Sequence, residues 1–419
     1  MTGFIEYLAT ALFALAVIHT FSVPVFARLA NKGGPNAGMW HLLSEVEAVF
    51  GVWAAVLVAC MVLFTGVGNA VAYVDAANFT EPAFVFAIMV VAASRPIIEL
   101  VDILVKGVAR LLPMRRELAM YFTILSIVPL AGSFITEPAA MTLAALLLRD
   151  TYFRRSEQVG FKYLTIGVLF VNVSIGGVLT AYAAPPVLMV AATFGWDTAY
   201  MATHFGWRAA VAVFISAAGL TLVCRKYLLE GTIGPVESTD RRPPVPPIFM
   251  AIHVAFLVAI VLAAHHISIF MGLLLLFVGF AHAYSRHQNP LLIREGLMVG
   301  FFLAGLVVLG GLQKWWLQDL LGGLSPTVLY WGAMVLTAVT DNAALTYLGS
   351  LVDGTSETWR YMLVAGAVTG GGLTVIANAP NPAGFTILKG CFPDGAISPL
   401  KLLGAALPPT LVAAVMFLI

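Results

Sequence analysis

Apolar runs long enough to form membrane helices recur along the whole of this 419-residue chain. A helix needs about 20 consecutive apolar residues to cross the hydrocarbon core of a bilayer. The composition agrees, because 60% of the residues are hydrophobic and only 10% are charged, whereas a soluble protein carries roughly 25% charged residues. A soluble globular enzyme, a disordered chain and a disulfide-stapled secreted domain are excluded. The sequence predicts an all-α polytopic membrane protein.

Ten of the runs are predicted to be transmembrane helices, and they begin near Phe4, Met39, Pro82, Gly160, Phe205, Pro247, Ile267, Arg294, Glu357 and Pro399. Two further apolar stretches, near 118–149 and 325–352, are interrupted at their middle by the triplets TEP (136–138) and TDN (340–342). Irregular polar backbone at that depth is tolerated only where it is buried in protein or lines a cavity. We therefore expect two re-entrant hairpins with these triplets at their tips.

Basic residues gather in alternate connections between the expected helices, as the positive-inside rule requires of cytoplasmic loops. Clusters such as 106–116, 149–162 and 225–242 then lie in the cytoplasm, and both the N-terminus and the C-terminus lie outside. No basic segment precedes the first apolar run, so we expect a first helix rather than a cleaved signal. The expected location is the bacterial inner membrane, with the lipid bilayer as a partner. The net charge of +1 gives no basis for a nucleic-acid partner.

An internal repeat relates the two halves of the chain. Residues 136–142 (TEPAAMT) match residues 340–346 (TDNAALT), and residues 176–180 (GGVLT) match residues 370–374 (GGGLT). A proline cluster follows each glycine segment. Each half therefore contains three spans, a hairpin with an acidic tip, one glycine-interrupted span and a last span.

The repeat also predicts the division of the chain. The first repeat covers residues 1–229, a cytoplasmic linker covers 230–247, and the second repeat covers 248–419. The two discontinuous helices run near 160–195 and 357–390. Because the first half starts outside and the second half starts inside, the two repeats are inverted. Interrupted helices at matching positions of inverted repeats indicate a transporter binding site near the bilayer midplane.

Glu137 and Asp341, at the two hairpin tips, are the strongest functional candidates. A charged side chain at mid-bilayer costs about 2.5–3.5 kcal/mol on insertion scales, and neither hairpin offers a Lys or Arg at that depth. Such a carboxylate can exchange a proton for a cation such as Na⁺, and nearby hydroxyls, amides and freed backbone groups suit a hard cation. The predicted ion- or substrate-binding residues are Thr136, Glu137, Asn172, Ser174, Gly176, Gly177 and Thr180 in the first half, and Thr340, Asp341, Asn342, Gly371, Gly372, Thr374, Asn378 and Asn381 in the second.

Three charged residues of the third expected span allow two interpretations. Arg95, Glu99 and Asp102 stand at i, i+4 and i+7, so they lie near one helix face. Arg95 and Glu99 form an internal salt bridge in one interpretation. In the other, Glu99 and Asp102 belong to a proton path.

His41, Glu45 and Glu47 lie near the cytoplasmic start of the second expected span. No third ligand stands at a spacing that makes a metal site convincing, so anchoring at the membrane interface is favoured. Catalytic patterns are absent as well: the sequence holds no His-Glu-x-x-His, no Gly-x-Ser-x-Gly and no Lys-Ser/Thr after its triple glycine. We expect no enzyme activity, and no cofactor apart from Na⁺ and H⁺ as transported or coupling ions.

The motifs together resemble the ion transporter superfamily, which includes arsenite-pump-type permeases, dicarboxylate/sodium symporters and the type-D bacterial sodium/proton antiporters. Residues 98–102 (IELVD) resemble the Glu-(Leu/Ile)-(Ile/Val)-Asp motif of the antiporter branch, and residues 340–342 (TDN) resemble its Val-Asp-Asn hairpin tip. Residues 370–382 resemble its glycine-rich broken helix, and Arg149 matches the basic residue that closes its first hairpin. The resemblance covers most of residues 80–390, and the chain is most similar to the group named putative sodium/proton antiporters.

One departure concerns the first hairpin, where that branch usually carries Asp-Asn and this chain has Glu137-Pro138. The acid is kept and the amide is lost, which changes the ligands available at the first tip. The resemblance also implies a homodimer, in which outer spans form a scaffold. Hairpins and broken helices would then move as a transport domain in an elevator mechanism.

Two functions remain open at this point. The first is antiport of Na⁺ (or Li⁺) against H⁺ at Glu137 and Asp341. The second is sodium-coupled transport of a small carboxylate or oxyanion, as in the dicarboxylate and arsenite relatives. Two acidic tips would repel a dianion unless cations bound first, so the sequence favours antiport over anion transport.

Overall fold

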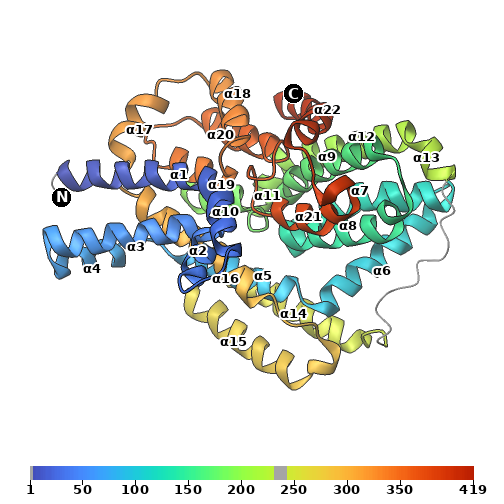
Figure 1. Cartoon of the computed structure of the whole chain (residues 1–419), viewed down its shortest axis with the longest axis horizontal. Helices are drawn as coiled ribbons and strands as arrows, with labels where there is room; N and C mark the ends of the chain where they lie inside the picture. The colour runs from blue at the N-terminus through green and yellow to red at the C-terminus, as the bar shows by residue number, and fades with distance from the viewer. Residues whose placement is uncertain (1–2, 231–242) are drawn as a thin grey trace.

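The computed structural model describes residues 3–230 and 243–419, and within these ranges every regular element is a helix (Figure 1). Residues 231–242, most of the expected linker, lie outside the described residues. The helices before the linker are α1 (Gly3–Asn31), α2 (Ala37–Leu43), α3 (Val46–Thr65), α4 (Val67–Asp75), α5 (Thr80–Ala92), α6 (Arg95–Leu111), α7 (Arg116–Ile135), α8 (Glu137–Thr151), α9 (Val159–Gly176), α10 (Pro185–Phe194), α11 (Thr198–Met201), α12 (Trp207–Val223) and α13 (Arg225–Glu230).

The helices after the linker are α14 (Pro247–Leu262), α15 (Ile267–Ala283), α16 (Ile293–Gly310), α17 (Lys314–Leu321), α18 (Pro326–Thr337), α19 (Asn342–Ser350), α20 (Glu357–Gly370), α21 (Asn381–Leu388) and α22 (Pro399–Leu418). Short helical turns complete the set: η1 (Phe153–Arg155), η2 (Gly177–Leu179), the π-helical η3 (Ala202–Gly206), η4 (Ser285–His287), η5 (Lys389–Cys391) and η6 (Pro393–Gly395).

The helix lengths support a polytopic membrane protein. Seven helices in the described ranges are long and apolar enough to cross a membrane, or eight when α4 and α5 count as one bent span. The predicted number of ten crossings is therefore not confirmed. The helices α14 and α15, expected as full spans, have 16 and 17 residues, and α20 has 14.

The expected third span is wrong as a single helix. The structure ends α5 at Ala92 and starts α6 at Arg95, with Ser94 in the extended conformation of an N-cap residue and Pro96 in the first turn. Proline is favoured in the first turn of a helix and disfavoured in its interior. Arg95 therefore lies at a helix start rather than within a span.

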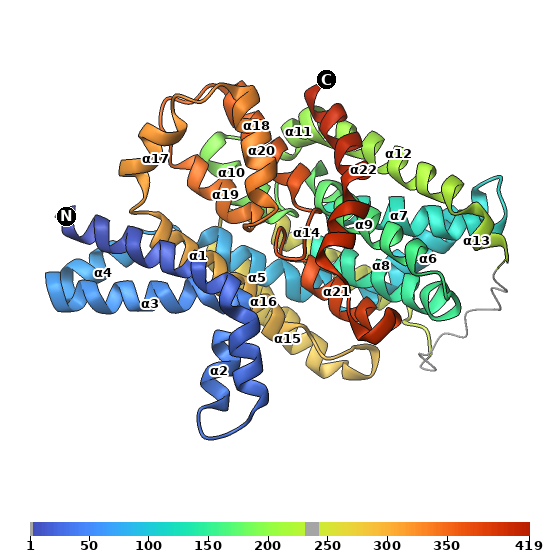
Figure 2. The same ribbon diagram turned by 45° about the horizontal axis from the view of Figure 1, so that its top comes forward.

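Helix contacts divide the molecule into two groups. In the first, α3 packs on α1 and α16, while α5 packs on α14, α15 and α16. In the second, α7 packs on α8, α9 and α12, α9 and α12 pack on α22, and α18 packs on α20. Figure 2 shows α1 and α3 on one side and α7, α9, α12 and α22 on the other. The contacts of α6 with α7 and of α16 with α19 join the groups.

A break between helices falls at each of the two predicted tips. The first lies between α7 and α8 at Thr136, and the second lies between α18 and α19 at Ala338–Asp341. The two differ in their first limb, because α7 has 20 residues and is long enough to cross a membrane, whereas α18 has 12.

Both predicted helix interruptions are present as well. Helix α9 ends at Gly176 and the chain resumes as α10 at Pro185, while α20 ends at Gly370 and the chain resumes as α21 at Asn381. The resumed halves cross over: α10 packs on α19 of the second hairpin, and α21 packs on α8 of the first. Each hairpin is thus held by a helix from the other half of the chain.

Candidate functional site

Glu137 is the first residue of α8 and is fully buried. Its position is locally favoured, because an acidic side chain and a following proline both suit the first turn of a helix. The Oε2 atom of Glu137 accepts a hydrogen bond of 2.8 Å from Nδ2 of Asn378. Its Oε1 atom is buried and has no hydrogen-bond partner among the described residues. The carboxyl group is therefore half satisfied.

The backbone around Glu137 is strained and tightly packed. Thr136 has a φ of 72°, and it is the one non-glycine residue with positive φ in the described ranges; strained backbone of this kind clusters at functional sites. A Cβ atom on Gly177 would stand 2.4 Å from Oε1 of Glu137. Only glycine therefore fits at position 177 while the carboxyl group keeps this place.

Asp341 lies at the second tip in a different environment. It is the N-cap residue of α19, where its Oδ1 atom accepts hydrogen bonds from the backbone N–H groups of Ala343 (2.8 Å) and Ala344 (3.2 Å). Aspartate is among the best N-cap residues because it satisfies these otherwise free donors. The side chain is only partly buried, and it borders a cavity of about 220 Å³.

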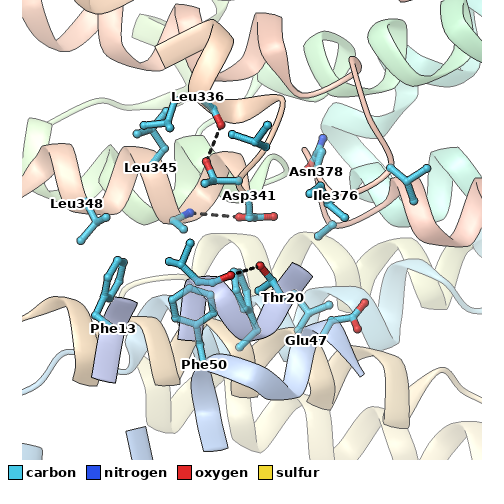
Figure 3. A pocket seen from close by; sticks show the side chains of 18 of the residues that line it. Phe13, Thr20, Glu47, Phe50, Leu336, Asp341, Leu345, Leu348, Ile376 and Asn378 are labelled. Carbon is cyan, nitrogen blue, oxygen red and sulfur yellow. Dashed lines mark hydrogen bonds between the residues drawn. The ribbon is translucent and has the colours of Figure 1, made fainter. Parts of the chain in front are cut away.

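The cavity lies between the two helix groups (Figure 3). One wall is formed by Asp341, Asn378 and neighbouring residues of α18, α19 and the unwound segment before α21. The opposite wall comes from α1, α3 and α16, and it includes Phe50 and Glu47. Figure 3 shows Asp341 and Asn378 on one side and Glu47 on the other. The sequence favoured the membrane interface for Glu47, and no spacing or motif connects Glu47 with Asp341.

Asn378 connects the two tips. Its side chain is buried, donates the hydrogen bond to Glu137, and lines the cavity that Asp341 borders. The backbone N–H of Asn342, the residue after Asp341, donates to the carbonyl of Ala377, the residue before Asn378 (3.1 Å). The two carboxylates thus share one neighbouring side chain rather than standing in two separate sites.

Several buried oxygens near the two tips have no hydrogen-bond partner among the described residues. Unsatisfied polar atoms are rare in protein interiors and call for an explanation, such as an ion or water that occupies the site. Within the described part of the chain, those near the two tips are Thr136 Oγ1, Glu137 Oε1, Asn342 Oδ1, Asn378 Oδ1 and Asn381 Oδ1. Carboxylate, amide and hydroxyl oxygens are the ligands that hard cations prefer.

Two threonines hold the unwound segments against the hairpins. Thr180 donates to the carbonyl of Ser133 on α7, and Thr374 donates to the carbonyl of Ala338 after α18, both at 2.7 Å. The two hydroxyls take matching places in the two halves of the chain. Their hydrogen atoms are engaged with the backbone, which assigns them to positioning.

Other predicted residues also serve to join elements. Asn172 donates to the carbonyls of Leu125 and Val213, which fixes α9 to α7 and α12. Ser174 donates to the carbonyl of Val368, and Asn381 donates to the carbonyls of Gly371 and Thr374.

The predicted glycines allow close contacts between segments. Gly176 approaches the Pro129 carbonyl, Gly371 approaches Ser174 and Asn342, and Gly372 approaches Val171. Thr340 donates to the carbonyl of Leu336 and borders the cavity.

The charged residues of α6 have local partners. Glu99 stands 3.7 Å from Arg95 and accepts a hydrogen bond from the backbone N–H of Val245, and Asp102 pairs with Lys106 at 2.5 Å. The salt-bridge interpretation therefore describes this geometry. The structure brings neither Glu99 nor Asp102 into the cavity beside Asp341.

Comparison with known proteins identifies the family of this chain. A sequence profile of the family described as "Putative Na+/H+ antiporter" matches residues 4–419, nearly the whole chain. Comparison with individually curated proteins gave no match. The match extends over both helix breaks, both glycine interruptions and the helices that line the cavity. The chain is therefore a membrane transporter rather than an enzyme, and it belongs to the family of putative Na⁺/H⁺ antiporters.

Proposed function

We propose that this protein exchanges Na⁺ or Li⁺ for H⁺, and that Glu137 and Asp341 carry the exchange. One observation carries the proposal: the carboxylates at the two helix breaks share Asn378 as a neighbour. Asn378 donates a hydrogen bond to Glu137 and lines the cavity that Asp341 borders, and buried oxygens without partners lie near both tips. Family membership supports Na⁺ and H⁺ as the two exchanged ions.

The chemistry follows from charge balance in a medium of low dielectric constant. A buried carboxylate is costly when ionised without a partner, so it holds either a proton or a cation. When Na⁺ binds at the carboxylate oxygens, the proton leaves, and the reverse step releases Na⁺. One positive charge replaces another at the same oxygens, which is the minimum requirement for antiport.

The ligand set of the proposal combines both halves of the chain. Asp341 borders the cavity and offers the first carboxylate on that side. Beyond it, Asn378 can turn its free oxygen toward the ion while its amide nitrogen stays with Glu137. Asn342 and Thr136 add further oxygens next to the two carboxylates.

The proposal includes an elevator movement, in which the second helix group, with both hairpins (the hairpin group), moves past the first helix group of α1, α3, α5 and α14–α16 (the scaffold group). Support comes from the helix contacts, which are dense within each group and join them mainly through α6–α7 and α16–α19. The crossed packing of α10 on α19 and α21 on α8 supports inverted repeats that move together. A homodimer in the bacterial inner membrane remains part of the proposal on the resemblance. The distribution of basic residues supports an orientation with both termini outside.

The test uses purified protein in liposomes with a trapped pH dye and an imposed pH gradient. Na⁺, Li⁺, K⁺ and choline are added in turn to the wild type, Asp341→Asn and Glu137→Gln. We expect Na⁺ or Li⁺ to collapse the gradient in the wild type and to leave it intact in both variants. Asp319→Asn is the matched control, because Asp319 is an exposed carboxylate on α17 outside the cavity.

The contrary outcomes are distinct. Normal exchange in both Asp341→Asn and Glu137→Gln would show that the tip carboxylates do not carry the proton. No response of the wild type to any cation would contradict antiport. Uptake of a dicarboxylate or arsenite that depends on Na⁺ would then establish the sodium-coupled alternative.

A further inference from the structure

Glu47 stands in the first turn of α3, on the scaffold side of the cavity (Figure 3). The residues that line this cavity are mostly apolar, with Phe13, Phe50 and Phe302 among them. Of all the described residues that border it, Glu47 and Asp341 are the two with charged side chains. The cavity is thus a chamber with apolar walls and one carboxylate on each of two facing walls.

Glu47 differs in this respect from its neighbour Glu45. Glu45 pairs with Arg294 at 2.6 Å and stands 3.7 Å from His41, so its charge is balanced at the protein surface. In the ranges 3–230 and 243–419, Glu47 forms no direct ion pair, and its carboxylate accepts no hydrogen bond from another residue. Arg294, the partner of Glu45, acts on the Glu47 carboxylate only through space, and Glu47 is partly buried rather than on an open surface.

The two facing carboxylates belong to different helix groups. Glu47 belongs to α3, which packs on α1 and α16, whereas Asp341 belongs to the hairpin of α18 and α19. Carboxylates that face each other across apolar walls repel, and a cation between them removes the repulsion. A cleft lined by one sign of charge and by walls of low dielectric constant also concentrates the opposite ion.

We propose that Glu47 is the receiving carboxylate of the transport path: it draws a monovalent cation into the cavity and passes it to Asp341. Asn378, whose buried oxygen lacks a partner and whose side chain lines the same cavity, is the next ligand on the way to Glu137. This role rests on the proposed function, and it adds a scaffold residue to a site otherwise built from the hairpin group.

The test measures Na⁺-driven proton movement against Na⁺ concentration in liposomes. Glu47→Gln should raise the Na⁺ concentration for half-maximal rate about tenfold, because a charged cleft enriches its counter-ion, and it should leave the maximal rate within about twofold. Glu47→Asp keeps the charge and should restore the wild-type value. Glu45→Gln is the matched control. It removes the same charge two residues earlier in the chain, and the side chain of Glu45 does not line the cavity.

A second measurement remains decisive if Glu47→Gln folds poorly. Glu47→Cys is prepared in a background without Cys60, Cys224 and Cys391 and is modified with an anionic or a cationic methanethiosulfonate reagent. The anionic adduct should recover the wild-type Na⁺ dependence, and the cationic adduct should not. Equal effects of the two adducts would overturn the role of Glu47.

The remaining outcomes separate the two proposals. Wild-type protein that shows no Na⁺-driven proton movement overturns the proposed function. Wild-type exchange with an unchanged Na⁺ dependence in Glu47→Gln, or with an equal shift in Glu45→Gln, overturns only the role of Glu47.

Discussion

The two hairpin tips have similar sequences and unlike surroundings. At the first, Glu137 is sealed between Gly177 and Asn378, and one of its oxygens has no partner within the described residues. At the second, Asp341 caps α19 and borders the cavity between the helix groups. The local motif places an acid at each break, but the packing around the break decides whether that acid is closed off or open.

Under the proposed function, this difference gives the two tips distinct tasks. An open carboxylate would exchange ions with the cavity, whereas a sealed one would exchange them only through its neighbours. Asn378 is the neighbour that the structure provides, since it contacts Glu137 and lines the cavity of Asp341. The unequal access of the two carboxylates to the cavity has four measurable consequences, which decrease in size.

The largest effect concerns access from water. In a background without native cysteines, Asp341→Cys should react with a small water-soluble thiol reagent at least about 100-fold faster than Glu137→Cys, because a sealed group reacts only after local opening. The rates are measured by mass spectrometry. Thr340→Cys, at the same tip and on the same cavity, should react fast, and Ala140→Cys, buried in α8, should react slowly. Equal rates at 137 and 341 would remove the distinction.

The next effect concerns the close packing of the first tip. Gly177→Ala places a methyl group at 2.4 Å from Glu137 Oε1, so the carboxyl group or the backbone must shift. Overpacking of this kind costs about 2 kcal/mol, which should lower the Tm of the detergent-solubilised protein along with the exchange rate. Gly219→Ala on α12, where a Cβ meets nothing within 4 Å, should change neither. A fully active Gly177→Ala would show that Glu137 does not need its present place.

The third effect concerns the connection between the tips. Asn378→Ala leaves both oxygens of Glu137 without a donor, and loss of a partner from a buried polar group costs about 1–3 kcal/mol. We expect a clear fall in the exchange rate at unchanged protein yield, measured in the liposome assay. Asn69→Ala serves for comparison, because Asn69 is exposed and donates only to the carbonyl of Thr65 in its own region. A wild-type exchange rate in Asn378→Ala would show that Asn378 does not couple the two carboxylates.

The smallest effect is the loss of stability when a threonine hydroxyl is removed, and it should be equal at the two tips. Thr180→Val and Thr374→Val each remove one hydrogen bond of 2.7 Å to a hairpin carbonyl, which should cost about 1 kcal/mol of stability. The measurement is the Tm of each variant beside Thr65→Val, whose hydroxyl donates within its own helix. A loss of Na⁺ affinity in either variant, without a change in Tm, would identify that hydroxyl as a direct ligand instead.

The sequence by itself determined the membrane class, the two breaks at Glu137 and Asp341, and the glycine interruptions near 176 and 370. These features are local, because span length, helix capping and the loss of helix at glycine and proline depend on residues within a few positions of each other. One local signal was missed: Ser94 and Pro96 flank Arg95 as they do at a helix start, and the expected third span is two helices.

Only the tertiary structure decided how the acids differ. The hydrogen bond from Asn378 to Glu137 joins residues 241 positions apart, and no periodicity or spacing reports a contact of that kind. The place of Glu47 opposite Asp341 likewise depends on how α3 packs beside the hairpin group. Burial, partners and access belong to the three-dimensional surroundings of a carboxylate, because the low-dielectric medium around it is built by segments distant in the chain.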